Sequence, residues 1–301
     1  MLATYNGEKY IREQLESLAE QTWTDFICYI HDDGSRDQTL SICREYCQHD
    51  PERFKILEYE KAGGAKENFL SLLDYADGDY VFFCDQDDVW LPEKMEKMIR
   101  AAEQADGECL VYCDLKVTNE SLQVISDSYY SYIRFYPEQM DQHNVLIRSG
   151  IPGCAIMATR GIVQLAMKYR NAEHLVMHDW WVCLAAMMSG AQAIGICEPL
   201  VMYRQHGDNS VGAAHYSTID KIRNASRRLF NGTLRETKKH DMELIRNQAK
   251  ELYDSGIGTD ESRQFLKEYI ELSGKNKIER IRFYLQYFGK MDRLGWLLLW
   301  A

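Results

Sequence analysis

Short apolar runs and longer segments with helical spacing alternate along the first 90 residues of the chain. The apolar runs are rich in β-branched and aromatic residues, which favours strands. In the segments between them apolar side chains recur every three or four positions, as at Ile11, Leu15 and Leu18, which predicts amphipathic helices. Strands that alternate with helices are typical of parallel βαβ units. The predicted strands lie at 1–5, 26–31, 54–59 and 80–84.

Local signals indicate where two of the helices begin. Ser35 and Gln38 form a capping box ahead of an apolar series, and Pro92 favours the first position of a later helix. The first strand is short, because few apolar residues precede Ala3, whereas a buried central strand usually carries several more. This shortness favours a natural start of the strand upstream of Met1.

The middle of the chain predicts further strands, one long loop and one buried helix. The segment 119–144 is rich in tyrosine and polar residues with weak periodicity, which is typical of a long functional loop. Beyond Tyr216 helix-forming residues dominate and the strand signal ends, so we expect an α/β domain over 1–212 and a helical region over 213–301. The remaining predicted elements are strands at 109–117, 154–159, 193–196 and 200–203 and a helix at 178–188.

Composition and charge exclude several classes of protein. The chain has 35 Lys and Arg against 46 Asp and Glu, a net charge of −11, which disfavours general binding to nucleic acids. Its nine cysteines contain no Cys-x-x-Cys pair and lie mostly in apolar runs, which is typical of reduced core thiols. No apolar run approaches the ~18 to 20 residues of a membrane span. We therefore expect a cytoplasmic protein.

The strongest chemical signal is an apolar strand at 80–84 that is followed by Asp85, Asp87 and Asp88. Ligands bind beyond the carboxyl ends of strands in open α/β sheets, and carboxylates there can hold Mg²⁺ or Mn²⁺. Asp32 and Asp33 follow the second strand and should face the same edge. Crowded like charges repel, so this pattern predicts a divalent cation. The alternative is an acidic turn that only caps the next helix.

Six motifs, in this order, resemble those of family 2 glycosyltransferases with the GT-A fold. The Asp-Gln-Asp-Asp-Val-Trp and His-Asp-Trp-Trp segments are similar to bacterial rhamnosyltransferase-like enzymes of surface polysaccharide assembly. The resemblance implies a Rossmann-like, mostly parallel central sheet flanked by helices, with a nucleotide-binding half at about 1–117 and an acceptor half at about 118–212. The motifs are Ala-Thr-Tyr-Asn-Gly at 3–7, Asp-Asp-Gly-Ser at 32–35, Gly-Ala-Lys-Glu-Asn at 64–68, Asp-Gln-Asp at 85–87, His-Asp at 178–179 and Arg-Gln-His at 204–206.

The resemblance also implies residues that bind the nucleotide. Thr4, Tyr5 and Asp33, helped by Asp32, match positions that hold the base, where a tyrosine ring can stack and a carboxylate can accept from a base N–H. Two further residues, Lys66 and Asn68, match the segment that approaches the nucleotide and its diphosphate. The alternative for that segment is an exposed first turn of a helix.

For the metal, the resemblance implies that Asp85 contacts the ribose or the ion and that Asp87 is a direct ligand. His206 matches a histidine that completes the metal site in many relatives, and a neutral imidazole suits Mn²⁺. The cation, Mn²⁺ or Mg²⁺, would stabilise the departing diphosphate as a Lewis acid. Arg204 is a further candidate for contact with the diphosphate.

For catalysis, the resemblance implies that Asp179 is the general base. A single base without a protein nucleophile implies inversion at the anomeric carbon. Many members carry Glu where this chain has His178. Trp180 and Trp181 are expected to form a sugar-stacking wall, or one of them core. For Asp179 the alternative is a helix cap.

The sequence therefore predicts a transferase that moves rhamnose or a hexose from dTDP-rhamnose or a UDP-hexose to a lipid-linked or growing bacterial surface polysaccharide. Two other classes stay open: a haloacid-dehalogenase-type phosphohydrolase, since an apolar strand precedes Asp-x-Asp-x-Val, and a sugar-nucleotide-binding protein without catalysis. The basic residues and the Trp-Leu-Leu-Leu-Trp segment at 296–300 suit peripheral contact with an anionic inner membrane leaflet. The alternative there is a helical cap packed on the catalytic domain.

Overall fold

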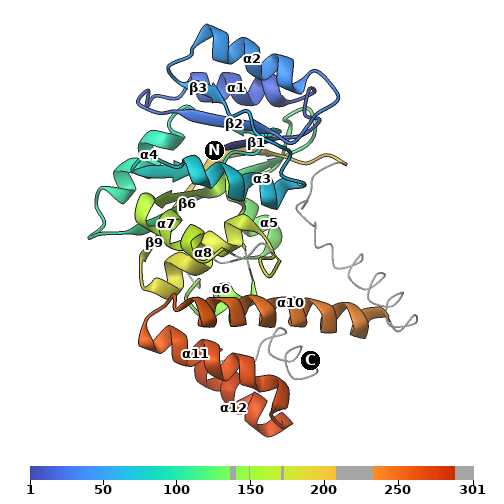
Figure 1. The fold of residues 1–301 in the computed structure, drawn as a ribbon, viewed down its shortest axis with the longest axis vertical. Coiled ribbons are helices and arrows are strands. Elements are labelled where there is room, and N and C mark those ends of the chain that lie inside the picture. Colours follow the sequence, from blue (N-terminus) through green and yellow to red (C-terminus); the bar gives the residue numbers. More distant parts are fainter. Residues whose placement is uncertain (136–139, 149, 171–172, 208–232, 289–301) are drawn as a thin grey trace.

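The protein is an α/β structure with a helical region stacked at one end (Figure 1). A computed structural model describes residues 1–135, 140–148, 150–170, 173–207 and 233–288. Helices α1 and α2 lie at one end, the strands and their flanking helices fill the middle, and α10, α11 and α12 form the other end. No helix among the described residues is both long enough and apolar enough to cross a membrane.

The first sheet contains only parallel strands, in the order β1 (Leu2–Thr4), β2 (Cys28–Asp32) and β3 (Phe54–Ile56). Each connection runs through a helix, as βαβ topology requires. A parallel bridge between Leu2 and Cys84 joins this sheet to the segment after β4. The helices are α1 (Ile11–Ala19), α2 (Thr39–His49) and α3 (Ala65–Leu72).

The second sheet is mixed and has the order β4-β8-β6-β9-β5, with β7 beside β6. β6 pairs in parallel with β9, whereas β4 and β6 pair antiparallel with β8, and β5 pairs antiparallel with β9. The expected GT-A α/β arrangement is confirmed, and parallel pairing is complete only in the first sheet. The strands are β4 (Tyr80–Phe82), β5 (Val89–Trp90), β6 (Cys109–Thr118), β7 (Val124–Ser126), β8 (Ile156–Thr159) and β9 (Gln192–Arg204).

Helices α4 (Lys94–Ala102), α7 (Arg160–Lys168) and α8 (His178–Ser189) flank the second sheet. α8 is buried on nearly every side, which explains its almost uninterrupted apolar sequence. It ends at Gly190, whose φ of 82° lies in the left-handed region that closes a helix. All nine cysteines are free and most are buried, as expected of core thiols.

Three local predictions were wrong. Ser35 does not cap a helix, because its hydroxyl donates to Asp32, and the carboxylate of Asp37 accepts from the Thr39 N–H at the start of α2 instead. The expected loop at 119–144 contains β7, α5 (Tyr129–Ile133) and the start of α6 (Asn144–Ile147). The two short strands expected at 193–196 and 200–203 form the single strand β9, whose pairing register shifts between them.

The C-terminal region is helical, as predicted, and packs on the α/β domain. Its helices are α10 (Thr233–Ser255), α11 (Asp260–Glu271) and α12 (Lys277–Phe288). Gln248 of α10 accepts from the Val176 N–H, and Ser262 of α11 donates to the Met188 carbonyl at the end of α8. The predicted boundary near residue 212 lies outside the described residues.

Candidate active site

The loops after β1, β2 and β4 meet at one edge of the sheet. The side-chain amide of Gln86 accepts from the Tyr5 N–H at 2.8 Å and donates to the Tyr5 carbonyl at 2.9 Å. The Asn6 N–H donates to the Ser35 hydroxyl at 2.7 Å, which adds the β2 loop. The carboxyl ends of these strands therefore bring the predicted motifs together.

Thr4 and Asp32 form the framework of this edge. The Asp32 carboxylate accepts from the Thr4 hydroxyl at 3.0 Å and from the backbone N–H groups of Gly34 and Ser35 at 3.1 and 2.7 Å. Thr4 is 1% exposed. The two side chains thus hold the turn in place, and the ring of Tyr5, 53% exposed, is free to meet a ligand face.

Asp33 is held by the loop that precedes α3. Its carboxylate accepts from the N–H groups of Ala62, Gly63 and Gly64 at 2.7, 3.0 and 2.8 Å. Gly63 and Gly64 have φ values of 94° and 146°, which a residue with a side chain rarely adopts. The β2 and β3 loops are therefore joined through this one carboxylate.

Asn68 and Lys66 lie differently from what the motif resemblance implies. Asn68 is 2% exposed, its side-chain oxygen lies 2.6 Å from Nδ1 of His31, and its NH₂ donates to the His31 carbonyl, so it stabilises the core and is not presented to a diphosphate. Lys66 donates to the Leu175 carbonyl at 3.1 Å and pairs with Glu67. It is partly exposed, so it stays a candidate for contact with the donor.

The predicted metal ligands Asp87 and His206 contact each other. Oδ2 of Asp87 lies 2.7 Å from Nε2 of His206, although 119 positions separate the residues. Both side chains are mostly buried. The structure therefore brings together two of the three predicted ligands.

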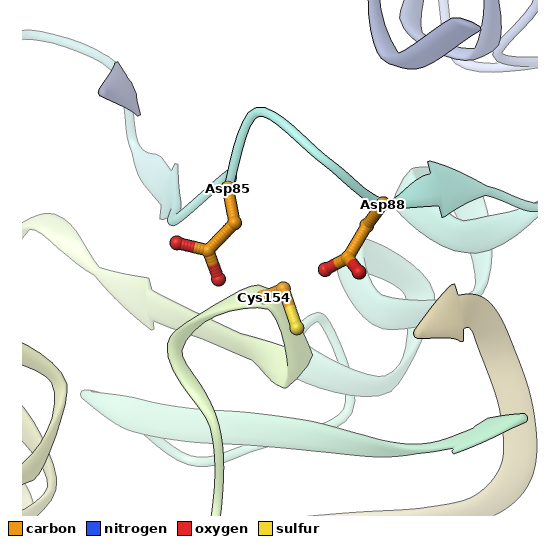
Figure 2. Close-up of side chains that lie close together, drawn as sticks. All are labelled: Asp85, Asp88 and Cys154. Carbon is orange, nitrogen blue, oxygen red and sulfur yellow. The ribbon is translucent and has the colours of Figure 1, made fainter. Parts of the chain in front are cut away.

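Asp85 and Asp88 lie beside a thiol that the sequence reasoning missed. Figure 2 shows their carboxylates and Cys154 facing the same space, and the three candidate ligand atoms all lie within 4.8 Å of one another. Cys154 comes from a short 3₁₀ helix, Gly153–Ala155, before β8. No spacing signal in the chain marks it, because 66 positions separate it from Asp88.

These acids are electrostatically crowded. Burial raises the pKa of Asp85 to about 7, with further increases from the charges of Asp87 and Asp179. Burial also raises the pKa of Asp88 well above its usual range, and its Oδ2 atom is buried without a hydrogen-bond partner. The crowded carboxylates of Asp85 and Asp87 beside the imidazole of His206 fit a divalent cation that accepts oxygen and nitrogen ligands. The residues present thus suit Mn²⁺ or Mg²⁺.

Arg204 is bonded to the loop at 85–88, which we call the acidic loop. It is 2% exposed, donates from Nε to the Asp87 carbonyl and from Nη1 to the Glu120 carbonyl, both at 2.7 Å, and pairs through Nη2 with Glu13. Its backbone N–H donates to Asp88 at 3.0 Å. The expected contact with a diphosphate is therefore wrong for this structure, because every nitrogen of the side chain faces the protein interior.

Asp179 lies in the first turn of α8, where its Oδ1 accepts from the Trp180 N–H at 2.7 Å. Its charge contributes to the raised pKa of Asp85, so the predicted base lies within electrostatic reach of the metal ligands. His178 is buried against Phe69, with ring centroids 4.0 Å apart, and burial lowers its pKa. A neutral imidazole therefore precedes the predicted base.

The two tryptophans have different environments. Trp181 is fully buried and donates to the Ala166 carbonyl at 2.9 Å, so it is a core residue, as the alternative for one of the two tryptophans expects, and it forms no part of a sugar wall. Trp180 is partly exposed and donates to the Val145 carbonyl at 2.5 Å. It stays a candidate for the sugar wall.

A family model agrees with this arrangement of motifs. The model described as Glycosyl transferase family 2 matches residues 1–162, more than half of the 301 residues. The chain belongs to glycosyl transferase family 2. Its relatives in this family include the dTDP-rhamnosyl transferase RfbG of Shigella flexneri, 30% identical over 237 residues that cover 74% of this chain and 79% of that protein.

Other proteins are similar to this chain in sequence or in fold. The putative teichuronic acid biosynthesis glycosyltransferase TuaG of Bacillus subtilis is 28% identical over 72% of this chain and 82% of its own. Among solved structures, the match to S. aureus TarS 1–349 covers 98% of this chain and 76% of the TarS chain, with a TM-score of 0.59 at 17% identity. The same fragment in complex with UDP-GlcNAc also has a TM-score of 0.59, at 16% identity. This likeness shows the GT-A fold.

Proposed function

We propose that this family 2 glycosyltransferase is a metal-assisted, inverting enzyme that transfers rhamnose or a hexose from a nucleoside-diphosphate donor. The observation that carries the proposal is the contact of Asp87 with His206 beside Asp85, within electrostatic reach of Asp179. A metal site and a base at one edge are what transfer from a diphosphate requires.

In the proposed reaction Asp179 accepts the proton of the acceptor hydroxyl as the oxygen attacks the anomeric carbon. Asp85, Asp87 and His206 would hold the divalent ion, which would supply Lewis-acid stabilisation to the leaving diphosphate. Tyr5 offers a stacking face to the base, and the Asp33 carboxylate, already placed by three N–H groups, offers an acceptor. One displacement without a protein nucleophile inverts the anomeric centre.

The donor class is drawn from the relatives. RfbG is named for dTDP-rhamnose, and TarS has been solved with UDP-GlcNAc. Uracil and thymine present the same N–H to a carboxylate acceptor, so the site suits either nucleotide. For the acceptor we propose a lipid-linked or growing bacterial surface polysaccharide, which accords with the name of TuaG.

The two other classes from the sequence receive less support. In a haloacid-dehalogenase-type phosphohydrolase the acidic motif follows the first strand, whereas here it follows β4. The family match likewise favours a transferase. A binding protein without catalysis would keep the donor site and would not need Asp179, so the Asp179 variant described in the Discussion separates it from an enzyme.

A thermal-shift panel tests the proposal directly. The full chain is heated with dTDP-rhamnose, UDP-glucose, UDP-galactose, UDP-GlcNAc or GDP-mannose, each with Mn²⁺, Mg²⁺ or EDTA. A ligand that binds the native state raises the melting temperature by mass action. We expect a shift with one nucleotide class, dependent on metal and lost in Asp87→Ala. A folded sample that responds to none of them contradicts the proposal.

We further propose a location at the cytoplasmic face of the membrane. α12 exposes Ile278 and Leu285, at 64% and 48%, on a helix that also carries Lys277, Arg280 and Arg282. Such a face suits an anionic bilayer surface. α10 and α11 pack on the catalytic domain, as the helical-cap alternative expects, while the segment 296–300 lies outside the described residues.

Liposome flotation tests the membrane contact. We expect the protein to float with anionic vesicles, less so in high salt and less so for Ile278→Ser/Leu285→Ser. Val124→Ser, in the exposed strand β7, is the matched control. A protein that stays out of the lipid fraction at low salt contradicts the membrane contact and leaves the transferase proposal untouched.

A further inference from the structure

A buried lysine lies beneath the acidic loop. Lys94, at the start of α4, is 0% exposed, and its Nζ donates to the Cys154 carbonyl at 2.6 Å. The same nitrogen lies 3.1 Å from the centroid of the Trp90 ring. Lysine is almost never fully buried without a compensating charge, so this position calls for an explanation.

Burial lowers the pKa of Lys94, and the groups that favour its charged form are nearby thiols and Asp88 of the acidic loop. The Lys94 ammonium and the carboxylates of Asp85 and Asp88 act on one another electrostatically. Cys154 connects them, because its carbonyl binds Lys94 while its Sγ lies within 4.8 Å of both carboxylates. The other buried cation of this region, Arg204, is paired with Glu13. Lys94 is therefore a buried cation whose charge acts on the acidic loop.

The group Asp85, Asp88 and Cys154 could itself be taken for a second metal site. Lys94 argues against that interpretation, because its ammonium donates to the Cys154 carbonyl and acts electrostatically on Asp85, so it opposes a further divalent ion beside these residues. Asp87 and His206, which contact each other, are the better place for the ion.

We propose that Lys94 is a positioning residue that shares the neutralisation of the acidic loop with the divalent ion of the active site. Before the ion binds, Lys94 balances the crowded carboxylates and keeps Asp85 in place. After it binds, Lys94 limits how tightly the ion is held, which favours its release with the diphosphate product. This inference rests on the proposed metal-assisted function.

The test measures Mn²⁺ binding and stability of Lys94→Met, which keeps the length and apolar stem of the side chain. Free Mn²⁺ is quantified by electron paramagnetic resonance, and melting is followed in EDTA and in Mn²⁺. We expect a lower melting temperature in EDTA, a dissociation constant for Mn²⁺ that falls about tenfold, and a larger Mn²⁺-induced rise in melting temperature, because a repelling charge is gone. A merely structural lysine would leave Mn²⁺ affinity unchanged or weaken it, and either result overturns the proposal.

Lys97→Met is the matched control, since Lys97 lies on the same helix and pairs with Glu93 and Glu198 at the surface. We expect its Mn²⁺ affinity to equal that of the wild type. The double variant Lys94→Met/Asp88→Asn removes the ammonium together with one of the acids on which it acts, so its stability in EDTA and its Mn²⁺ affinity should return toward wild-type values. If the single variant fails to fold, folding of the double variant supports the charge balance. Failure of both variants to fold overturns it.

The two proposals fail in different ways. A wild-type protein that binds no Mn²⁺ with or without UDP contradicts the proposed metal site. A wild type that binds Mn²⁺ with a constant equal to that of Lys94→Met contradicts only the role of Lys94.

Discussion

The nucleobase side of the site, around Asp32 and Asp33, and the metal side, around Asp85 and Asp88, are built in opposite ways. On the nucleobase side, the carboxylates of Asp32 and Asp33 accept hydrogen bonds from backbone N–H groups of the loops after β2 and β3, and Thr4 and Asn68 are buried and paired. On the metal side, like charges crowd together, burial raises the pKa of Asp85 to about 7, and an oxygen of Asp88 is buried without a partner.

The difference teaches which half of the site is complete without a ligand. Hydrogen bonds from N–H groups satisfy a carboxylate and fix its direction, so the nucleobase side is preorganised by the chain alone. Unpaired acids are costly to bury, so the metal side reaches its lowest free energy only with added positive charge. Lys94 and the divalent ion are the two sources that we propose.

The largest effect should come from removing the proposed general base, Asp179. Asp179→Asn keeps the size of the side chain and an oxygen that can accept from the Trp180 N–H. Loss of a general base costs about 10² to 10⁴ in rate, so we expect transfer to fall by that factor while the Mn²⁺-dependent thermal shift with donor persists. Product formation from labelled donor is the measurement. Full activity of this variant would show that another residue is the general base.

The next largest effect should come from loosening the metal side. Arg204→Met removes the donors to the Asp87 and Glu120 carbonyls and leaves Glu13 without its partner. We expect a loss of about 3 kcal/mol in the free energy of unfolding, by urea titration, together with weaker Mn²⁺ binding, since the Asp87 loop is no longer held.

Arg12→Met is the control for that experiment. Arg12 of α1 pairs with Glu45 of α2 at the surface, and exposed pairs contribute little. We expect no change in the urea midpoint or in Mn²⁺ binding. If Arg12→Met and Arg204→Met lower the urea midpoint equally, Arg204 contributes no more to stability than an exposed ion pair does.

The smallest effect should be a pH dependence confined to the metal side. Because the pKa values of Asp85 and Asp88 are raised on folding, the native protein binds more protons than the unfolded chain. In EDTA their contribution to stability is present below the ordinary carboxyl pKa of about 4 and is lost as the pH rises toward about 7. We expect the difference in urea midpoint between the wild type and Asp85→Asn/Asp88→Asn to shift in favour of the variant from pH 5 to 7.5.

Two comparisons check this interpretation. Asp37→Asn, at the start of α2, should show no such trend between pH 5 and 7.5, since partial burial is outweighed by hydrogen bonds from Thr39, which lower the pKa of Asp37. Addition of Mn²⁺ should flatten the trend in the wild type, because the ion holds the acids ionised. A midpoint difference that does not vary with pH contradicts the raised pKa values.

Much of this protein follows from short-range patterns. The alternation of apolar runs and helical repeats predicted β1 to β4 and the helices between them, because burial of one face imposes its period on the residues of each element. Acids placed directly after strands predicted one shared edge, because parallel strands point their carboxyl ends the same way. The contact of Asp87 with His206 was expected only from the order of family motifs.

Tertiary structure decided which of these side chains face a ligand. Asn68, Trp181 and Arg204 belong to motifs that suggest a site, yet all three are buried and bonded to the protein. Cys154 and Lys94 carry no motif and lie beside the acids only because β8 and α4 pack there. Residue type and spacing specify what chemistry is available along the chain, whereas the direction of a side chain and its pKa depend on neighbours that folding brings from distant positions.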